Sequence, residues 1–288
     1  MLNWFVLSLA AALTQAGQFA VVKGRAREIP PLVIVAGTQV VAFTAWLLFF
    51  AISGHPFVSP GRAWPAIAAS SVLVMVMSSL LARASARGDI SIVGPVFALS
   101  PIFTVIPDAV LSGTLPSPLG WVGIVLAMTG TLSLSGKPGG GRLRALFARR
   151  DALDALGAAI LLGVLAAVDR WGALALGPPS YLAYSHAAAG LLTGSVAAIV
   201  LRRRLAAVAT PSNVLTLTAH GLLGVTGTGM QTIALTMAPA AYVNAIRRLS
   251  AVLAVGLGRA LFGEPDLGRR LAAAVLASAG AACLLLAR

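Results

Sequence analysis

The chain has 288 residues, of which 58% are hydrophobic and only 10% are charged. A soluble domain carries about 25% charged residues, so this composition excludes a water-soluble globular protein. The formal net charge is +13, but the basic residues punctuate apolar runs instead of forming one patch. Anionic lipid headgroups are therefore a simpler partner than nucleic acid. We predict a membrane protein that crosses the lipid bilayer several times.

Ten apolar segments follow one another along the chain, each near the roughly 20 helical residues that cross a hydrocarbon core of about 30 Å. Cut at charges, prolines and glycines, they cover 2–22, 31–53, 63–86, 90–113, 117–136, 153–176, 179–201, 212–237, 240–263 and 268–287. Their runs lack the two-residue alternation of a membrane barrel, so we predict an all-α integral membrane protein with ten transmembrane helices. The first segment lacks the basic n-region of a signal peptide and nine spans follow it, so we expect it to be retained.

The one long connection, a Gly-rich and then basic linker over 137–151, divides the chain into residues 1–136 and 152–288, with five spans each. Moving the sequence along itself by 150 residues without a gap pairs identical residues. The pairs include Leu99 with Leu249, Ser100 with Ser250, Gly113 with Gly263 and Gly130 with Gly280. A repeat with an odd number of spans inserts its copies with opposite polarity, as in secondary transporters that bind their substrate between the halves. We therefore predict an inverted five-plus-five repeat.

The lysines and arginines of the connections predict the orientation, because short cytoplasmic loops carry an excess of these residues. The odd-numbered connections hold nearly all of them, whereas the even-numbered connections hold only Arg62. By this rule the odd-numbered connections, including the 137–151 linker, are cytoplasmic, and both termini lie outside.

Two stretches of the sequence resemble a known family of transporters. Residues 84–130, with Gly-Asp-Ile-Ser-Ile-Val-Gly-Pro and Leu-Ser-Pro-Ile-Phe, are similar to the EamA domain of the drug/metabolite transporter superfamily, and so are residues 238–264. Asp169-Arg170 resembles the acidic–basic pair that many such domains place at this point. The resemblance implies two EamA domains with ten helices, a central cavity and alternating-access movement of small metabolites.

Two features depart from the family pattern. The family usually ends its fourth span with Gly-Glu, which the second half keeps at Glu264 and the first half replaces with Thr114. Family members also usually have cytoplasmic termini, whereas the loop charges of this chain indicate the opposite. We give the loop charges more weight, because their asymmetry is large.

Charged residues inside the spans are the strongest functional candidates, because each costs a few kcal/mol at the helix centre unless it is paired or hydrated. Counting along the helices places five charges and one histidine about 8–12 Å from the even-numbered side. They are Asp108, Asp169, Arg170, His186, Arg247 and Arg248. One interpretation is that the charges only neutralise one another, and another is that an arginine reaches the lipid headgroups. The third is that one guanidinium is left over for an anionic or zwitterionic substrate.

Asn244 and Arg248 lie four residues apart on one face of the ninth span, which we predict to line the cavity. We expect Arg248 to hold an anionic group of the substrate, with Asp108 or Asp169 balancing Arg247. A buried polar residue joins two helices more often than it binds a ligand, so further residues are weaker candidates. They are Gln15, Gln18, Ser78, His220 and Gln231.

No motif indicates an enzyme, a cofactor or a metal site. The sequence has no Walker loop with its lysine, and its three histidines and single Cys283 lack metal-ligand spacing. Cys283 lies in an apolar run and indicates a lipid- or core-facing residue. The resemblance to the EamA domain implies a secondary transporter that exports small metabolites such as amino acids across the inner membrane. The alternative is a carrier or flippase for nucleotide-sugar or lipid-linked sugar substrates.

Overall fold

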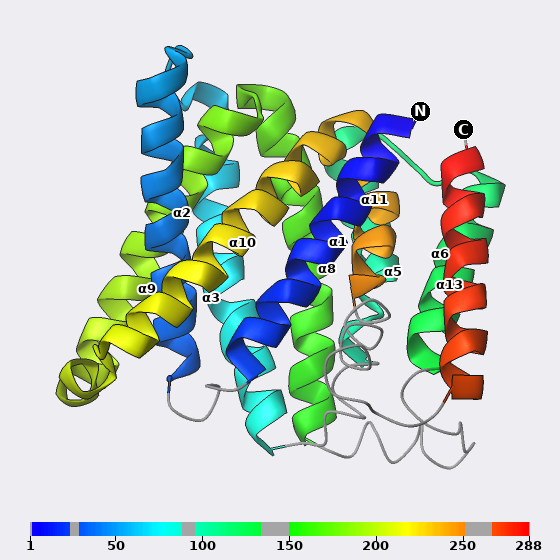
Figure 1. Ribbon diagram of the computed structural model, residues 1–288. Helices are drawn as coiled ribbons and strands as arrows, with labels where there is room; N and C mark the ends of the chain where they lie inside the picture. Colours follow the sequence, from blue (N-terminus) through cyan, green and yellow to red (C-terminus); the bar gives the residue numbers. More distant parts are fainter. Residues whose placement is uncertain (1, 24–28, 88–95, 134–149, 251–266, 288) are drawn as a thin grey trace.

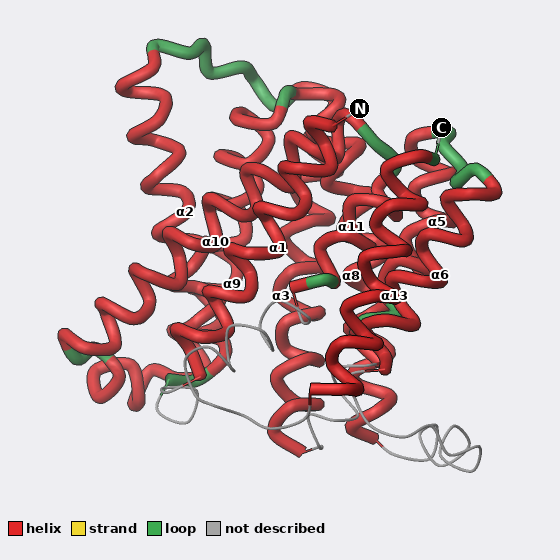
Figure 2. The backbone as a smooth tube through the Cα atoms, turned by 45° about the vertical axis from the view of Figure 1, so that its right-hand side comes forward, coloured by secondary structure: helices red, strands yellow, loops and turns green. Residues whose placement is uncertain are grey.

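The computed structural model describes residues 2–23, 29–87, 96–133, 150–250 and 267–287. Within them the protein consists of helices and connecting loops without strands, which confirms the predicted all-α class (Figures 1 and 2). The first half contains α1 (Leu2–Lys23), α2 (Pro31–Ser53), a 3-10 turn (Gly61–Ala63), α3 (Trp64–Arg87), α5 (Ser100–Ser112) and α6 (Pro118–Ser133). The second half contains α8 (Arg150–Leu176), α9 (Pro178–Val208), α10 (Pro211–Met237), α11 (Ala240–Arg248) and α13 (Leu267–Leu286).

Proline marks the start of several helices, where it is well tolerated because the first N–H groups of a helix have no intrahelical partner. α2, α9 and α10 begin at Pro31, Pro178 and Pro211. The apolar span within α9 runs from Pro178 to Arg202, close to the predicted segment 179–201, and the helix itself continues to Val208. Arginine is a good helix former, so a basic run does not by itself end a helix. Parts of the predicted segments 90–113 and 240–263 lie outside the described residues.

The outer faces of the helices are apolar. Within the described residues, four helical segments are long and apolar enough to cross a membrane: Pro31–Ser53, Gly61–Ala84, Arg150–Leu176 and Pro178–Arg202. Large apolar side chains on their surfaces and on α5 are between 73% and 85% exposed, namely Ile52, Ile106, Val110, Leu191 and Ile199. The interior instead buries charged groups. An apolar exterior with a charged interior identifies a multi-pass membrane protein.

The helices are arranged as two groups of three and two flanking pairs. α8 packs against α3 and α5, and we name these three helices the first bundle. α1 packs against α10 and α11, which form the second bundle. The two bundles meet where α5 and α8 contact α10 and α11, and Figure 1 shows them between α2 and α9 on the left and α6 and α13 on the right. Each bundle therefore combines helices from both halves of the chain.

Small residues bring α6 and α13 close together. A Cβ atom added to Gly280 would lie only 2.8 Å from the carbonyl oxygen of Gly123, and closer still to the backbone nitrogen of Ala127. Close backbone approach of this kind is typical of helix pairs inside membranes. There the hydrophobic effect does not drive helices together, and small residues allow the close van der Waals packing that does. The pair thus depends on the absence of a side chain at Gly280.

The start of α1 and the end of α13 lie at the same end of the molecule, the upper end in Figure 1. The loop between α2 and α3 is at this end as well (Figure 2). This is the side of the even-numbered connections, so both termini share it. That this side faces away from the cytoplasm stays a prediction from the loop charges.

Candidate functional site

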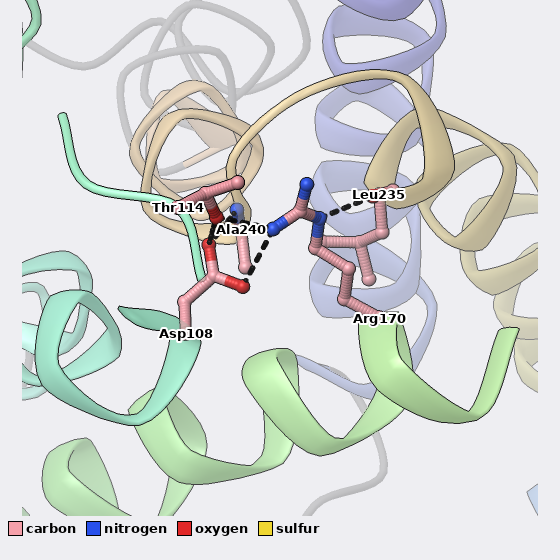
Figure 3. A network of polar contacts seen from close by, with 5 residues as sticks. All are labelled: Asp108, Thr114, Arg170, Leu235 and Ala240. Carbon is pink, nitrogen blue, oxygen red and sulfur yellow. Dashed lines mark hydrogen bonds and ion pairs between the residues drawn. The ribbon is translucent and has the colours of Figure 1, made fainter. Parts of the chain in front are cut away.

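A buried ion pair joins the two bundles. Arg170 Nη1 of α8 lies 2.8 Å from Asp108 Oδ1 of α5, and the two residues are 7% and 1% exposed (Figure 3). The other carboxylate oxygen accepts the backbone N–H of Ala240 at 2.7 Å, and Arg170 Nε donates to the carbonyl oxygen of Leu235 at 2.9 Å. The hydroxyl of Thr114 accepts from Arg170 Nη1 and donates to Asp108. The first bundle thereby holds the connection between α10 and α11.

Elementary helix geometry explains why this connection attracts an ion pair. The carbonyl of Leu235 has no partner in its own helix, because the residue four positions on is Pro239, which has no N–H. The N–H of Ala240 is equally free, because it opens α11. Asp108 at the start of α11 and Arg170 at the end of α10 also complement the dipoles of these helices. Thr114, which replaces the usual glutamate of the family, adds no second negative charge to the pair.

Asp169 is adjacent to Arg170 in the sequence but has entirely different partners. Its Oδ1 accepts hydrogen bonds from the hydroxyls of Ser70 at 2.8 Å and Tyr181 at 2.7 Å. Tyr181 is fully buried, and its ring occupies the space that a side chain at Gly172 would need. Within the described part of the chain, Asp169 forms no ion pair, and Arg247 of α11 is the cation that interacts with it electrostatically. Of the two carboxylates expected to balance Arg247, Asp108 instead pairs with Arg170, which leaves Asp169 as the candidate.

Three residues of α11 carry buried polar atoms that have no hydrogen-bond partner among the described residues. The atoms are Asn244 Oδ1, Arg247 Nε and Arg248 Nε. The amide nitrogen of Asn244 donates to the hydroxyl of Thr104 on α5 at 2.9 Å. Buried polar groups are nearly always paired, so one acceptor and two donors left open on a single helix are a feature that a polar ligand would explain.

Arg248 is buried between Phe97, which lies just before α5, and Gln15 of α1. Its guanidinium carbon lies 5.2 Å from the centre of the Phe97 ring, a cation–π distance. Its Nη2 donates to Gln15 Oε1 across 3.5 Å, and the hydroxyl of Ser250 donates to the same oxygen at 3.2 Å. Among the described residues, the long contact with Gln15 is the hydrogen bond that this guanidinium donates, and its Nε has no partner. No acidic side chain among the described residues forms an ion pair with Arg248.

The remaining candidate residues lie away from the charged group. His186 of α9 is hydrogen-bonded through Nδ1 to Gln39 of α2, and its other ring nitrogen is 3.4 Å from Thr228 of α10. The amide of Gln18 donates to the carbonyl of His220, whose ring bonds Thr38. These contacts join helices. Two further residues, Ser78 (half-buried on α3) and Gln231 (buried on α10), have no hydrogen bond to the charged residues among those described.

The sequence did not single out Ser70, Tyr181 or Thr104, although each contacts a predicted candidate. A tyrosine inside an apolar span was the available signal, because a buried hydroxyl on an aromatic ring needs a hydrogen-bond partner. Within the described residues, no group of three or more histidine, cysteine, aspartate and glutamate side chains is placed to hold a metal ion. Cys283 is a free cysteine and is half-buried.

Comparisons with known proteins agree with this architecture. Residues 2–136 match the EamA-like transporter family. A solved crystal structure has a TM-score of 0.78 to this chain and covers 98% of it and 97% of the other chain. At 17% identity this likeness shows the fold alone. No curated protein matches the chain.

The first half of the chain is thus similar to a family of membrane transporters, and the structural likeness extends the fold to the whole chain. The match of residues 2–136 to the EamA-like transporter family confirms the resemblance read from the sequence for this half of the chain. The family consists of transporters, in agreement with the prediction that the protein is not an enzyme. A second EamA domain over 152–288 stays a prediction.

Proposed function

We propose that the protein is a secondary transporter that exports small metabolites such as amino acids across the inner membrane by alternating access. The observation that carries this proposal is the set of unpaired polar atoms on α11, at the interface between the two bundles. α11 contacts α5 and α8 of the first bundle as well as its own partner α1. A substrate bound to α11 would therefore lie where both bundles can contact it.

The chemistry of these atoms favours a zwitterionic cargo. Arg248 Nε is a donor that would bind a carboxylate, and the planar guanidinium suits such a group. Asn244 Oδ1 is an acceptor that would bind an ammonium group. One helical turn separates the two residues, which is a rise of about 6 Å. An α-amino acid or a related metabolite carries both an ammonium group and a carboxylate.

We further propose that the chain forms an inverted five-plus-five repeat of helices. The packing supports this, because exchanging the first five helices with the last five converts observed contacts into other observed contacts. The contact of α3 with α8 becomes that of α10 with α1, α5 with α8 becomes α11 with α1, and α3 with α9 becomes α10 with α2. The pairs α2–α9, α5–α11 and α6–α13 map onto themselves, as pairs beside a two-fold axis do. Inverted repeats of this kind place the substrate between the halves.

In this scheme the ion pair of Asp108 and Arg170 closes one side of the transporter. It joins the first bundle to the α10–α11 connection of the second bundle at the even-numbered side, so that side opens only when the two bundles separate there. Alternating access in inverted-repeat carriers consists largely of such movements of one bundle against another. The unpaired atoms of α11 lie further along the same interface, where the substrate would be reached from the opposite side.

A transport assay tests the proposal directly. The purified protein is placed in proteoliposomes and offered labelled amino acids, dicarboxylates and sugar phosphates. We expect exchange of an amino acid or related zwitterion, a weaker rate for Arg248→Lys and none for Arg248→Ala, because lysine keeps the charge but loses the planar fork. Arg62→Ala is the matched control, because Arg62 is exposed. We expect this variant to transport normally. Normal transport by a folded Arg248→Ala protein, or exchange of sugar phosphates alone, contradicts the proposed cargo.

A further inference from the structure

We infer that transport is coupled to protons and that Asp169 is the residue that binds the proton. This inference rests on the proposed transport function and adds the coupling ion and its site. It starts from a contrast between two aspartates that approach the same interface from neighbouring helices of the first bundle. Asp108 is held by an amide N–H, a guanidinium and one hydroxyl, whereas Asp169 is held by hydroxyl groups alone.

Asp108 is unsuited to carry a proton. Its carboxylate receives an N–H from Ala240, a guanidinium N–H from Arg170 and the hydroxyl of Thr114. The amide and the guanidinium can only donate, so a protonated Asp108 would have no acceptor on their side. It would also leave the buried charge of Arg170 unpaired, which is costly. The structure therefore assigns Asp108 to holding helices together.

Asp169 has the opposite environment. Both hydrogen bonds to its Oδ1 come from hydroxyls, at 2.8 Å from Ser70 and 2.7 Å from Tyr181. A hydroxyl is a donor and an acceptor, so it can donate to the carboxylate and, after rotation, accept from the carboxylic acid. Both protonation states of Asp169 are thus satisfied by the same partners. The side chain of Asp108 is buried more completely than that of Asp169.

The charged and titratable groups around Asp169 come from three elements. Tyr181 is on α9, Arg247 is on α11, and Arg170, next to Asp169 on α8, is already neutralised by Asp108. α3 contributes only the neutral hydroxyl of Ser70. Among the described residues, Arg247 is therefore the cation whose electrostatic interaction with Asp169 changes when Asp169 gains or loses its charge. Because an unpaired carboxylate inside a membrane span is costly, protonation is the simplest way to remove that charge.

This arrangement would link proton binding to movement. Asp169 belongs to the first bundle and Arg247 to the second, so a charged Asp169 attracts the second bundle through Arg247. Binding of H⁺ converts the carboxylate into a neutral carboxylic acid, and the attraction ends. A proton taken up from one side and released to the other would then bias which side of the interface opens, because it interacts differently with the two arrangements. Each cycle would move one proton.

Infrared spectroscopy tests proton binding without any substrate. The purified protein is titrated with acid, and the C=O stretch of a protonated carboxylic acid in an apolar site is followed. We expect this band in the wild type and not in Asp169→Asn, which preserves the shape and the hydrogen bonds of the side chain. Asp154→Asn, a substitution at a partly exposed acid, should leave the band unchanged. Tyr181→Phe should move the pH of its disappearance upward, because the carboxylate loses one of its two donors. A band that persists in Asp169→Asn overturns the inference.

Proteoliposomes test coupling. With one proton per cargo molecule, each pH unit across the membrane supports about tenfold accumulation of a cargo that the wild type exchanges. Asp169→Asn should lose this accumulation, and its exchange should lose its pH dependence. Wild-type exchange that ignores the pH gradient overturns proton coupling while leaving the transporter proposal intact. If the wild type exchanges nothing, the transport proposal fails, and the infrared band alone decides whether Asp169 binds a proton.

Discussion

Arg170 reaches Asp108 with a nitrogen–oxygen distance of 2.8 Å, although the two residues are 62 positions apart in the chain and lie on different helices. Together with Thr114 and two backbone groups, they form a network that is shielded from the surroundings (Figure 3). Replacing the pair by residues without charge removes both charges at once, whereas replacing one partner leaves the other buried and unpaired. The two kinds of change should therefore have different consequences.

The single substitutions Arg170→Gln and Asp108→Asn should each destabilise the folded protein by about 3–5 kcal/mol, the usual cost of a buried charge that loses its partner. The double variant should be destabilised by clearly less than the sum of the two, because the residues are coupled. Thermal unfolding in detergent measures the difference. Arg83→Gln is the control, because Arg83 is 55% exposed and its ion pair among the described residues is a long one, 3.9 Å from Asp154. Its loss should change stability by less than about 1 kcal/mol. Additive effects in the double variant contradict direct coupling.

Gly280→Ala should separate α6 from α13 and destabilise the protein by about 1–3 kcal/mol, the usual cost of overpacking. The new methyl group would meet the backbone of Gly123 and Ala127, which cannot move aside as a flexible side chain can. Gly194→Ala on α9 is the matched control, because nothing lies within 4 Å of the added Cβ. It should be neutral or slightly stabilising, since alanine favours helices over glycine by about 1 kcal/mol. Equal melting temperatures for the two variants would disprove the close contact.

Tyr242→Phe should loosen the start of α6. The hydroxyl of Tyr242 on α11 accepts the backbone N–H of Ser117 at 2.9 Å, one of the groups at the beginning of α6 that lack an intrahelical partner. Phenylalanine keeps the ring but leaves this N–H unsatisfied, at a cost of about 1–3 kcal/mol. Tyr184→Phe provides the comparison, because the structure gives the Tyr184 hydroxyl no hydrogen bond among the described residues. Hydrogen exchange at the amide of Ser117 should accelerate in the first variant only.

The positions of the helices could be predicted from the sequence because bilayer thickness fixes the length of an apolar segment. The observed α2, Pro31–Ser53, coincides with its predicted segment, and most other described ends differ by only a few residues. The exception is α9, where the basic run at Arg202 continues the helix. Helical propensity and favourable headgroup contacts both permit this, so charge is a poor marker of a helix end near the membrane surface.

The partners of the charged residues could not be predicted in the same way. Counting residues gives the depth of a side chain along a helix but not the direction in which it points. Asp169 and Arg170 differ by one position, which rotates the side chain by about 100° and directs the two residues at different neighbours. His186 was predicted at the depth of the charged group, yet it contacts Gln39 and α10. Which helix lies opposite each face is a property of the tertiary fold.

The orientation in the membrane can be settled with a matched pair of cysteines. Ala209 and Ser59 are both exposed and lie in loops, the first between α9 and α10 on the odd-numbered side and the second between α2 and α3 on the even-numbered side. In a Cys283→Ala background, we expect an impermeant thiol reagent to label Ser59→Cys in intact cells and Ala209→Cys only after permeabilisation. The reason is that the arginines and lysines of the odd-numbered connections should be retained in the cytoplasm. Because the same reagent is applied to both positions, poor access of the reagent cannot produce this difference between them. The opposite labelling pattern would place both termini in the cytoplasm, as is usual in the family. The loop charges would then not determine the topology of this chain.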